Sequence, residues 1–137
     1  MELLIGAALA LAVGIFATMS GFDKDRAFYP TVTIVVASYY VLYAVMAQPH
    51  AELLLELAAA AVFIIFAVAG FRQSLWFAVI ALVAHGVFDI VRAPAMVNII
   101  DNPGVPSWWP PFCLSYDVVA AIYLAWLLKT GRVRAGR

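Results

Sequence analysis

Five long runs of apolar residues leave few folds open to this chain. They cover residues 3–20, 31–47, 53–70, 75–91 and 112–128, and the first carries no charged residue. Each run approaches the roughly 20 residues that an α-helix needs to cross about 30 Å of hydrocarbon. Because lipid offers the backbone no hydrogen-bond partner, such runs must satisfy their N–H and C=O groups internally, as helices do. The sequence therefore predicts an all-α integral membrane protein, a single transmembrane domain of five helices over residues 1–137.

The composition excludes soluble classes of protein. Hydrophobic residues make up 66% of the 137 residues and charged residues 12%, whereas a typical soluble domain has roughly 45–50% and about 25%. Too little polar surface is available to cover a water-soluble core of this size. The formal net charge is zero and the chain has one cysteine. These values give no reason to expect nucleic-acid binding or a disulfide scaffold.

The distribution of basic residues predicts how the bundle is oriented. With five spans, the connection 21–30, the turn 71–74 and the C-terminal tail share one side of the membrane. Seven of the eight Lys and Arg residues fall on that side, and only Arg92 falls on the other. The positive-inside rule then predicts a multi-pass protein of a bacterial-type inner membrane, with the N-terminus outside and the C-terminus in the cytoplasm. The turn 48–51 and the Pro-rich connection 93–110 would face outside, while 21–30 would be a solvated loop.

Ionisable residues inside the predicted spans mark a candidate catalytic site. Four residues share this property: Glu56 on the third span, His85 and Asp89 on the fourth, and Asp117 on the fifth. Such groups are costly in hydrocarbon, so each is a functional position by default. The predicted topology puts all four in the outer half of the membrane, and the i,i+4 spacing puts His85 and Asp89 on one helical face. We expect His85, Asp89 and Asp117 to converge within hydrogen-bond reach or one water. Glu56 should face the same interior.

Aromatic and basic residues at the same depth are candidates for binding a substrate. These are Tyr39, Tyr43, Arg92, Trp108 and Trp109. A buried carboxylate needs a hydrogen-bond donor nearby, so we expect Tyr39, Tyr40 or Tyr43 to donate to Glu56. Adjacent tryptophans are also typical of the membrane–water interface. As site residues, Trp108 or Trp109 would cover an apolar cavity beside the cluster.

This set of residues suits proton-transfer chemistry on a lipophilic substrate. In a low-dielectric interior, one carboxyl group can hold a proton at neutral pH while a second, beside a histidine, stays ionised. Asp117 or Glu56 would then act as the acid, and His85 with Asp89 as the base. Double-bond isomerisation, cyclisation and epoxide opening are reactions of this kind. The sequence has no dinucleotide fingerprint and no serine-nucleophile motif, so hydride and acyl transfer are not expected and no cofactor is predicted.

The stretch from Trp76-Phe77-Ala78-Val79 through His85-x-x-x-Asp89 resembles the EXPERA group, which includes emopamil-binding sterol isomerases. Members of that group carry a His and a Glu four residues apart on a membrane helix. They also carry a further Glu on another helix and a comparable number of spans. The resemblance implies isomerase-like proton transfer on a lipid, with Asp89 at the second position and Asp117 as the further acidic residue on another helix.

Three other functions are alternatives. Buried acids and histidines form proton relays in transporters, but here they stay in one half of the membrane, so a pathway would run between chains of a homo-oligomer. One nitrogen and three carboxylates suit Mn, Fe or Zn. However, the only other histidine is His50 and no paired-His spacing is present, so no metal is predicted. The polar layer could also fix the fold of a non-catalytic accessory subunit. In every case, membrane lipids are expected partners of the chain.

Overall fold

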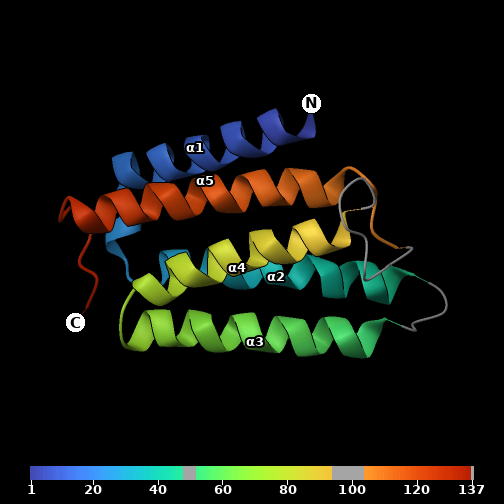
Figure 1. Cartoon of the computed structure of the whole chain (residues 1–137). Coiled ribbons are helices and arrows are strands. Elements are labelled where there is room, and N and C mark those ends of the chain that lie inside the picture. Colours follow the sequence, from blue (N-terminus) through green and yellow to red (C-terminus); the bar gives the residue numbers. More distant parts are fainter. Residues whose placement is uncertain (48–51, 94–103, 137) are drawn as a thin grey trace.

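The computed structural model of the chain describes residues 1–47, 52–93 and 104–136. Its α-helices are α1 (Glu2–Ser20), α2 (Phe28–Met46), α3 (Leu53–Arg72), α4 (Trp76–Arg92) and α5 (Trp109–Lys129), and the 3₁₀ helix η1 (Phe22–Lys24) joins α1 to α2. The helices run up and down, so the N-terminus and the C-terminal tail lie at opposite ends of the bundle (Figure 1). The turn predicted at 48–51 and residues 94–103 of the predicted long connection lie outside the described residues.

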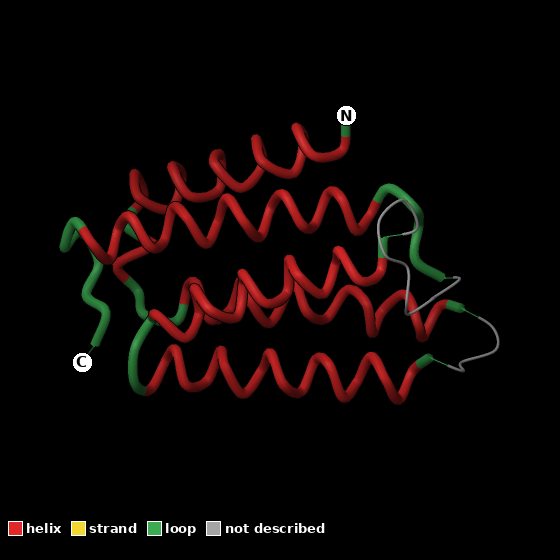
Figure 2. The backbone as a smooth tube through the Cα atoms, viewed as in Figure 1, coloured by secondary structure: helices red, strands yellow, loops and turns green. Residues whose placement is uncertain are grey.

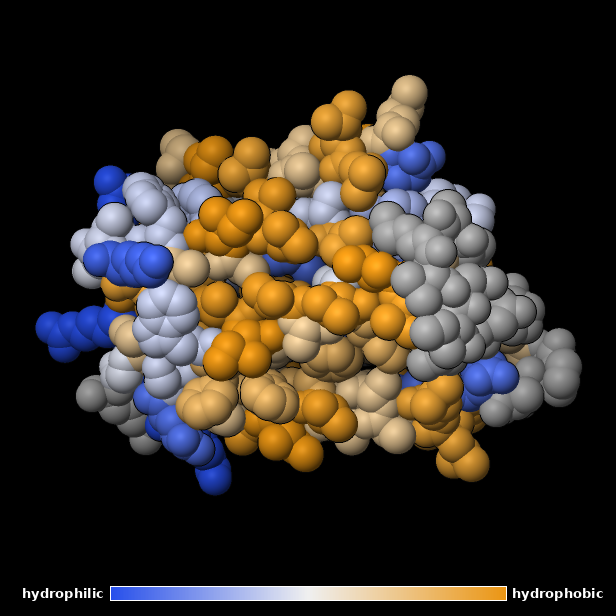
Figure 3. Space-filling model, viewed as in Figure 1, coloured by the Kyte–Doolittle hydropathy of each residue, from blue (hydrophilic) through white to orange (hydrophobic). Residues whose placement is uncertain are grey.

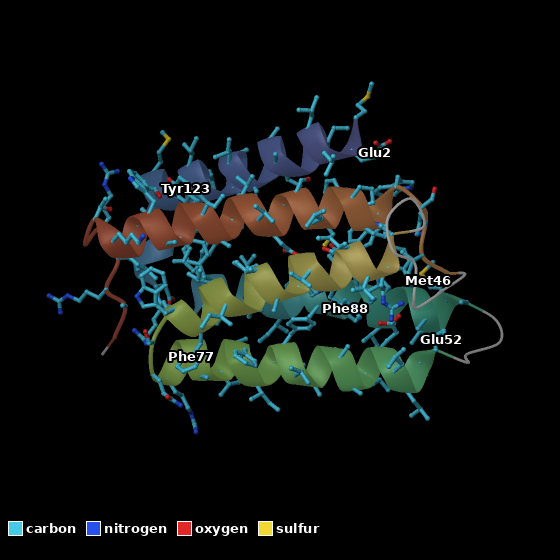
Figure 4. All side chains as sticks on the ribbon, viewed as in Figure 1. Glu2, Met46, Glu52, Phe77, Phe88 and Tyr123 are labelled. Atoms are coloured by element: carbon cyan, nitrogen blue, oxygen red, sulfur yellow. The ribbon has the colours of Figure 1, made fainter. Side chains whose placement is uncertain are left out.

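The helices form two packed groups that meet at α4. α5 lies between α1 and α4, while α3 packs against both α2 and α4 (Figures 1 and 2). Glu2, Met46 and Glu52 lie toward one end of the bundle, and Phe77 and Tyr123 toward the other (Figure 4). This arrangement surrounds α4 with α2, α3 and α5. Polar residues of α4 can therefore be buried against protein instead of lipid.

Four of the helices, α1, α2, α3 and α5, are long and apolar enough to cross a membrane. α4 has 17 residues, which corresponds to about 25 Å at about 1.5 Å per residue, somewhat short of the roughly 30 Å of hydrocarbon. An apolar belt covers the middle of the visible face, and hydrophilic residues gather at the end that carries the C-terminus (Figure 3). The all-helical, membrane-type fold is confirmed, and by length and composition four of the five expected spans are supported.

Two helices begin three residues earlier than the sequence predicts, and proline explains both differences. α2 begins at Phe28 and includes Pro30, while α5 begins at Trp109 and includes Pro110 and Pro111. The first N–H groups of a helix have no partner within the helix, so a proline in the first turn loses no hydrogen bond. The prolines that we expected to end the loops therefore belong to the helix starts.

The prediction that residues 21–30 form a solvated loop is wrong for one of the charged residues in this segment. Asp23, in η1, is buried, and its carboxylate accepts a hydrogen bond of 2.7 Å from the Thr18 hydroxyl of α1. The Thr18 hydroxyl also lies 2.9 Å from the Tyr123 hydroxyl of α5. The Asp23 carboxylate is thus bonded to a hydroxyl group at the end of α1 and is not hydrated by solvent. The same hydroxyl group connects it to α5 through Tyr123.

Small residues let α1 approach α5 closely. The buried residues of α1 are Gly6, Ala10, Gly14 and Ala17. A Cβ atom at Gly6 would lie 2.2 Å from the Phe112 carbonyl oxygen, and one at Gly14 would lie 2.9 Å from the Tyr123 ring. Such close packing of small residues is a main source of helix association in membranes, where apolar side chains gain nothing by leaving lipid. This contact fixes α1 on the face of α5 that also borders the cavity described below.

Candidate functional site

Three of the predicted residues converge in the interior of the bundle. His85 Nδ1 lies 2.7 Å from Asp117 Oδ2 and 3.7 Å from Asp89 Oδ2, and all three side chains are at most 2% exposed. His85 and Asp89 share a face of α4, and α5 packs against that face with Asp117. The expected convergence of His85, Asp89 and Asp117, which we call the acid–His cluster, is therefore present in the structure.

Apolar rings and one tyrosine hydroxyl enclose the acid–His cluster. The Tyr40 hydroxyl of α2 donates a hydrogen bond of 2.6 Å to Asp89 Oδ1. The rings of Tyr40, Phe63 and Phe88 have centroids 5.8, 4.8 and 6.0 Å from that of His85. In the view of Figure 4, Phe88 lies on the side of α4 that faces α3. These walls exclude water, and electrostatic interactions inside them are stronger than in solvent.

Glu56 and Arg92 form a buried ion pair next to the cluster. Arg92 Nη1 lies 2.6 Å from Glu56 Oε1. The guanidinium group also lies over the rings of Tyr40 and Phe88, 5.1 and 4.8 Å from their centroids. Glu56 thus faces the same interior as expected, but its carboxylate contacts Arg92. The Tyr40 hydroxyl, which we expected as one of three donors to Glu56, donates to Asp89.

The acid–His cluster has unused ligand atoms. Among the described residues, Asp89 Oδ2, Asp117 Oδ1 and His85 Nε2 have no hydrogen-bond partner. Cys113 adds a thiol whose Sγ lies 4.0 Å from Asp117 Oδ2. One ligand atom from each of these four buried residues falls within 4.8 Å of the others. A nitrogen, a sulfur and two oxygens are ligands that Zn²⁺ accepts in tetrahedral sites, so the arrangement can hold a transition-metal ion.

An apolar groove of about 570 Å³ lies beside the cluster, between α1, α2 and α5. Leu9 of α1 and Val35 of α2 are among its lining residues and are also exposed on the outside of the bundle. Its lining also includes Val36, Trp109 and Cys113. Cys113 therefore borders the apolar groove and also contacts Asp117, so it links the groove to the acid–His cluster. The volume lies within the range of about 300–1,000 Å³ of ligand pockets.

The predicted aromatic residues lie mainly at one end of this groove. Trp109 is buried, and its ring contacts Tyr39 and Tyr43 with centroid distances of 4.8 and 5.3 Å. Tyr39 and Trp109 line the groove. Trp108 is 48% exposed and stacks edge-on against Trp109. Of the two tryptophans, Trp109 thus takes the predicted position over the cavity, and Trp108 occupies the surface.

Two polar contacts of the structure were not part of the expected site. Cys113 contacts the acid–His cluster through Asp117 but was not among the predicted site residues. Its position one helical turn before Asp117 was the signal that could have placed it there. The Thr18–Asp23 contact lies at the C-terminal end of α1. No sequence pattern links Asp23 to a buried position, because it stands in a segment with three other charged residues.

No model of a protein family, no curated protein and no solved structure matches this chain. These comparisons give no support to the resemblance of residues 76–89 to the EXPERA group.

Proposed function

We propose that the chain is a polytopic inner-membrane enzyme that transfers protons on a lipophilic substrate. The observation that carries the proposal is the contact between the two parts of the site. An acid–His cluster with a 2.7 Å contact between His85 and Asp117 lies directly behind Cys113 at the wall of an apolar groove. A groove that opens toward lipid suits a terpenoid, sterol or fatty chain. An enclosed pair of carboxylates and an imidazole suits general acid–base catalysis.

The contacts favour a division of roles within the cluster. Asp117 faces the groove through Cys113 and is our candidate for the acid that protonates a substrate carbon. His85 and Asp89 are the candidate base, with Asp89 oriented by the Tyr40 hydroxyl. Glu56 was the other candidate acid, but its ion pair with Arg92 better suits a positioning role. In an isomerisation, one proton would be added to the substrate and another removed, so no co-reactant is consumed.

Deuterium incorporation tests the proposal without knowledge of the substrate. Purified protein is incubated with a lipid extract in D₂O, and lipophilic compounds are screened by mass spectrometry for new C–D bonds. Val35→Trp fills the lipid-facing side of the groove. The indole should displace the substrate and lower the rate of incorporation at least about tenfold, which corresponds to about 1.4 kcal/mol.

The matched control for the groove variant is Val45→Trp. Val45 lies on the same helix with a similar exposure, 51% against 46% for Val35, and is not among the groove residues. The control should retain the rate of the unmodified chain. No incorporation above protein-free vesicles would contradict the enzyme proposal, and equal rates in both variants would contradict the groove as the substrate site.

A metal centre is the second candidate, because four donor atoms lie within 4.8 Å of one another. Under the proton-transfer proposal, deuterium incorporation should persist after dialysis against a chelator. Inductively coupled plasma mass spectrometry should then find far less than one transition-metal ion per chain. About one ion per chain, lost together with activity on chelation and on Cys113→Ser substitution, would favour the metal centre instead.

We also propose an orientation of the bundle in the membrane. The basic residues Lys24, Arg26, Arg72, Lys129, Arg132 and Arg134 stand at the C-terminal ends of α1, α3 and α5 or in the segments that follow. We therefore place this end of the bundle, which carries the C-terminus, in the cytoplasm. A cysteine introduced at Ser107 should react with an impermeant maleimide in intact cells. A cysteine at Ala135 should react only after permeabilisation, with the buried Cys113 as an unreactive background. The opposite labelling pattern would invert the orientation.

A further inference from the structure

Four basic side chains converge on a pocket at the C-terminal end of the bundle. The pocket has a volume of about 320 Å³, and its lining includes Lys24, Arg26, Arg132 and Arg134. The first two come from the connection between α1 and α2, and the other two from the tail after α5. We call this the basic pocket. It lies at the opposite end of the bundle from Trp109 and the outer end of the apolar groove.

The tail is folded against the bundle, so its arginines are placed by the structure. Gly131 has a φ of 69°, a left-handed conformation that glycine adopts without strain. The chain then turns back, Val133 is buried, and the Leu75 N–H donates a hydrogen bond of 2.8 Å to the Ala135 carbonyl. Figure 1 shows this tail descending from α5 past the start of α4. The guanidinium of Arg132 stacks over the Trp126 ring at 4.4 Å.

The acidic side chains near the pocket are engaged elsewhere. Asp23 is buried and accepts from Thr18, while Asp25 accepts a hydrogen bond of 2.9 Å from the Ala27 N–H. Arg26 donates to the carbonyl oxygens of Phe71 and Gly70 at the end of α3, which holds its guanidinium in place. The described residues lining the pocket thus bring four positive charges together and include no acid. Like charges in one concavity repel each other, and a bound anion relieves that repulsion.

We propose that the basic pocket binds the phosphate group of an anionic phospholipid. The pocket lies where α1 and α5 end, at Ser20 and Lys129, which is the level of lipid headgroups for helices that cross the hydrocarbon. Arginine forms bidentate, charge-assisted hydrogen bonds with phosphate, and basic residues at a membrane surface attract anionic lipid. The proposal is independent of any reaction at the acid–His cluster.

Competition between lipids in detergent micelles tests the proposal on the full chain. Purified protein is titrated with phosphatidylglycerol in the presence of phosphatidylcholine, and bound lipid is measured by native mass spectrometry. Lys24→Gln with Arg134→Gln removes two charges from the pocket. Arg72→Gln with Lys129→Gln removes two charges from the same end, at exposed residues that do not line it. Each variant's secondary structure is checked by circular dichroism, and Arg134→Gln alone replaces the pocket pair if that pair fails to fold.

Selective binding of phosphatidylglycerol should weaken at least about tenfold more in the pocket pair than in the control pair. Hydrogen bonds to charged groups contribute about 1.5–3 kcal/mol each, and about 1.4 kcal/mol corresponds to tenfold. Equal weakening in both pairs would show general surface attraction and overturn the proposal. Displacement of the lipid by millimolar inorganic phosphate would identify free phosphate as the ligand and overturn the assignment to lipid.

Discussion

Asp117→Asn is expected to leave the fold intact and to slow deuterium incorporation by roughly 10²–10⁴-fold, the usual contribution of a general acid or base. The amide is nearly isosteric with the carboxyl group and can keep a hydrogen bond to His85, which lies 2.7 Å away. It cannot donate and recover an acidic proton. If the Asp117–His85 contact only joined α4 to α5, stability would fall by about 0.6 kcal/mol, the average for such contacts between membrane helices. The rate per folded molecule would then be unchanged.

Asp23→Asn provides a matched control for this variant. It makes the same chemical change at a second buried carboxylate, 3% exposed, that is hydrogen-bonded to Thr18 and lies outside the acid–His cluster. We expect its rate per folded molecule to stay within about twofold of the unmodified chain, because this carboxylate is bonded to Thr18 and takes no part in the proposed proton transfer. A large loss in Asp23→Asn, or none in Asp117→Asn, would remove the assignment of Asp117 as the acid.

Glu56→Leu or Arg92→Met is expected to lower the free energy of unfolding by about 3–5 kcal/mol, because each single change leaves a buried charge without its partner. The two side chains are 0% and 2% exposed, and their atoms are 2.6 Å apart. This loss of unfolding free energy is larger than the average for neutral hydrogen bonds between membrane helices, because here both partners are charged. The double variant Glu56→Leu/Arg92→Met should recover most of the loss, because a pair of apolar side chains leaves no charge to desolvate.

Reversible unfolding in mixed micelles of detergent and denaturing surfactant measures these differences. Glu2→Gln is the control, since Glu2 pairs with the N-terminal amino group at an exposed position. Changes at such positions are usually within about 0.5 kcal/mol. Additive losses in the double variant would show that Glu56 and Arg92 stabilise the bundle separately and not as a pair.

Four of the five spans and the members of the cluster could be predicted because both depend on position along a helix. Apolar length defines the spans, and depth in the membrane places His85, Asp89 and Asp117 in one layer. The starts of α2 and α5 were predicted too late, because a sequence does not show whether Pro30 and Pro110 belong to a loop or to the first turn of a helix. In both cases the difference is one helical turn and does not change the order of the elements.

The pairing of side chains could not be predicted. α1, α3 and α5 are apolar around most of their circumference, so no hydrophobic face fixes the rotation of each helix about its axis. Which donor meets Asp89, and whether Glu56 meets a tyrosine or Arg92, depends on that rotation. Only packing determines it, through contacts such as the small residues of α1 on α5.

The close fit of Gly6 and Gly14 against α5 has a consequence for biosynthesis. α5 is the last described helix to leave the ribosome, and membrane helices generally insert before they associate. Until residues 109–129 are in the bilayer, α1 lacks the surface that its glycines fit, and His85 lacks Asp117. The groove wall and the acid–His cluster are therefore both completed by the same late insertion. A nascent chain arrested before α5 would hold α1 to α4 but no assembled site.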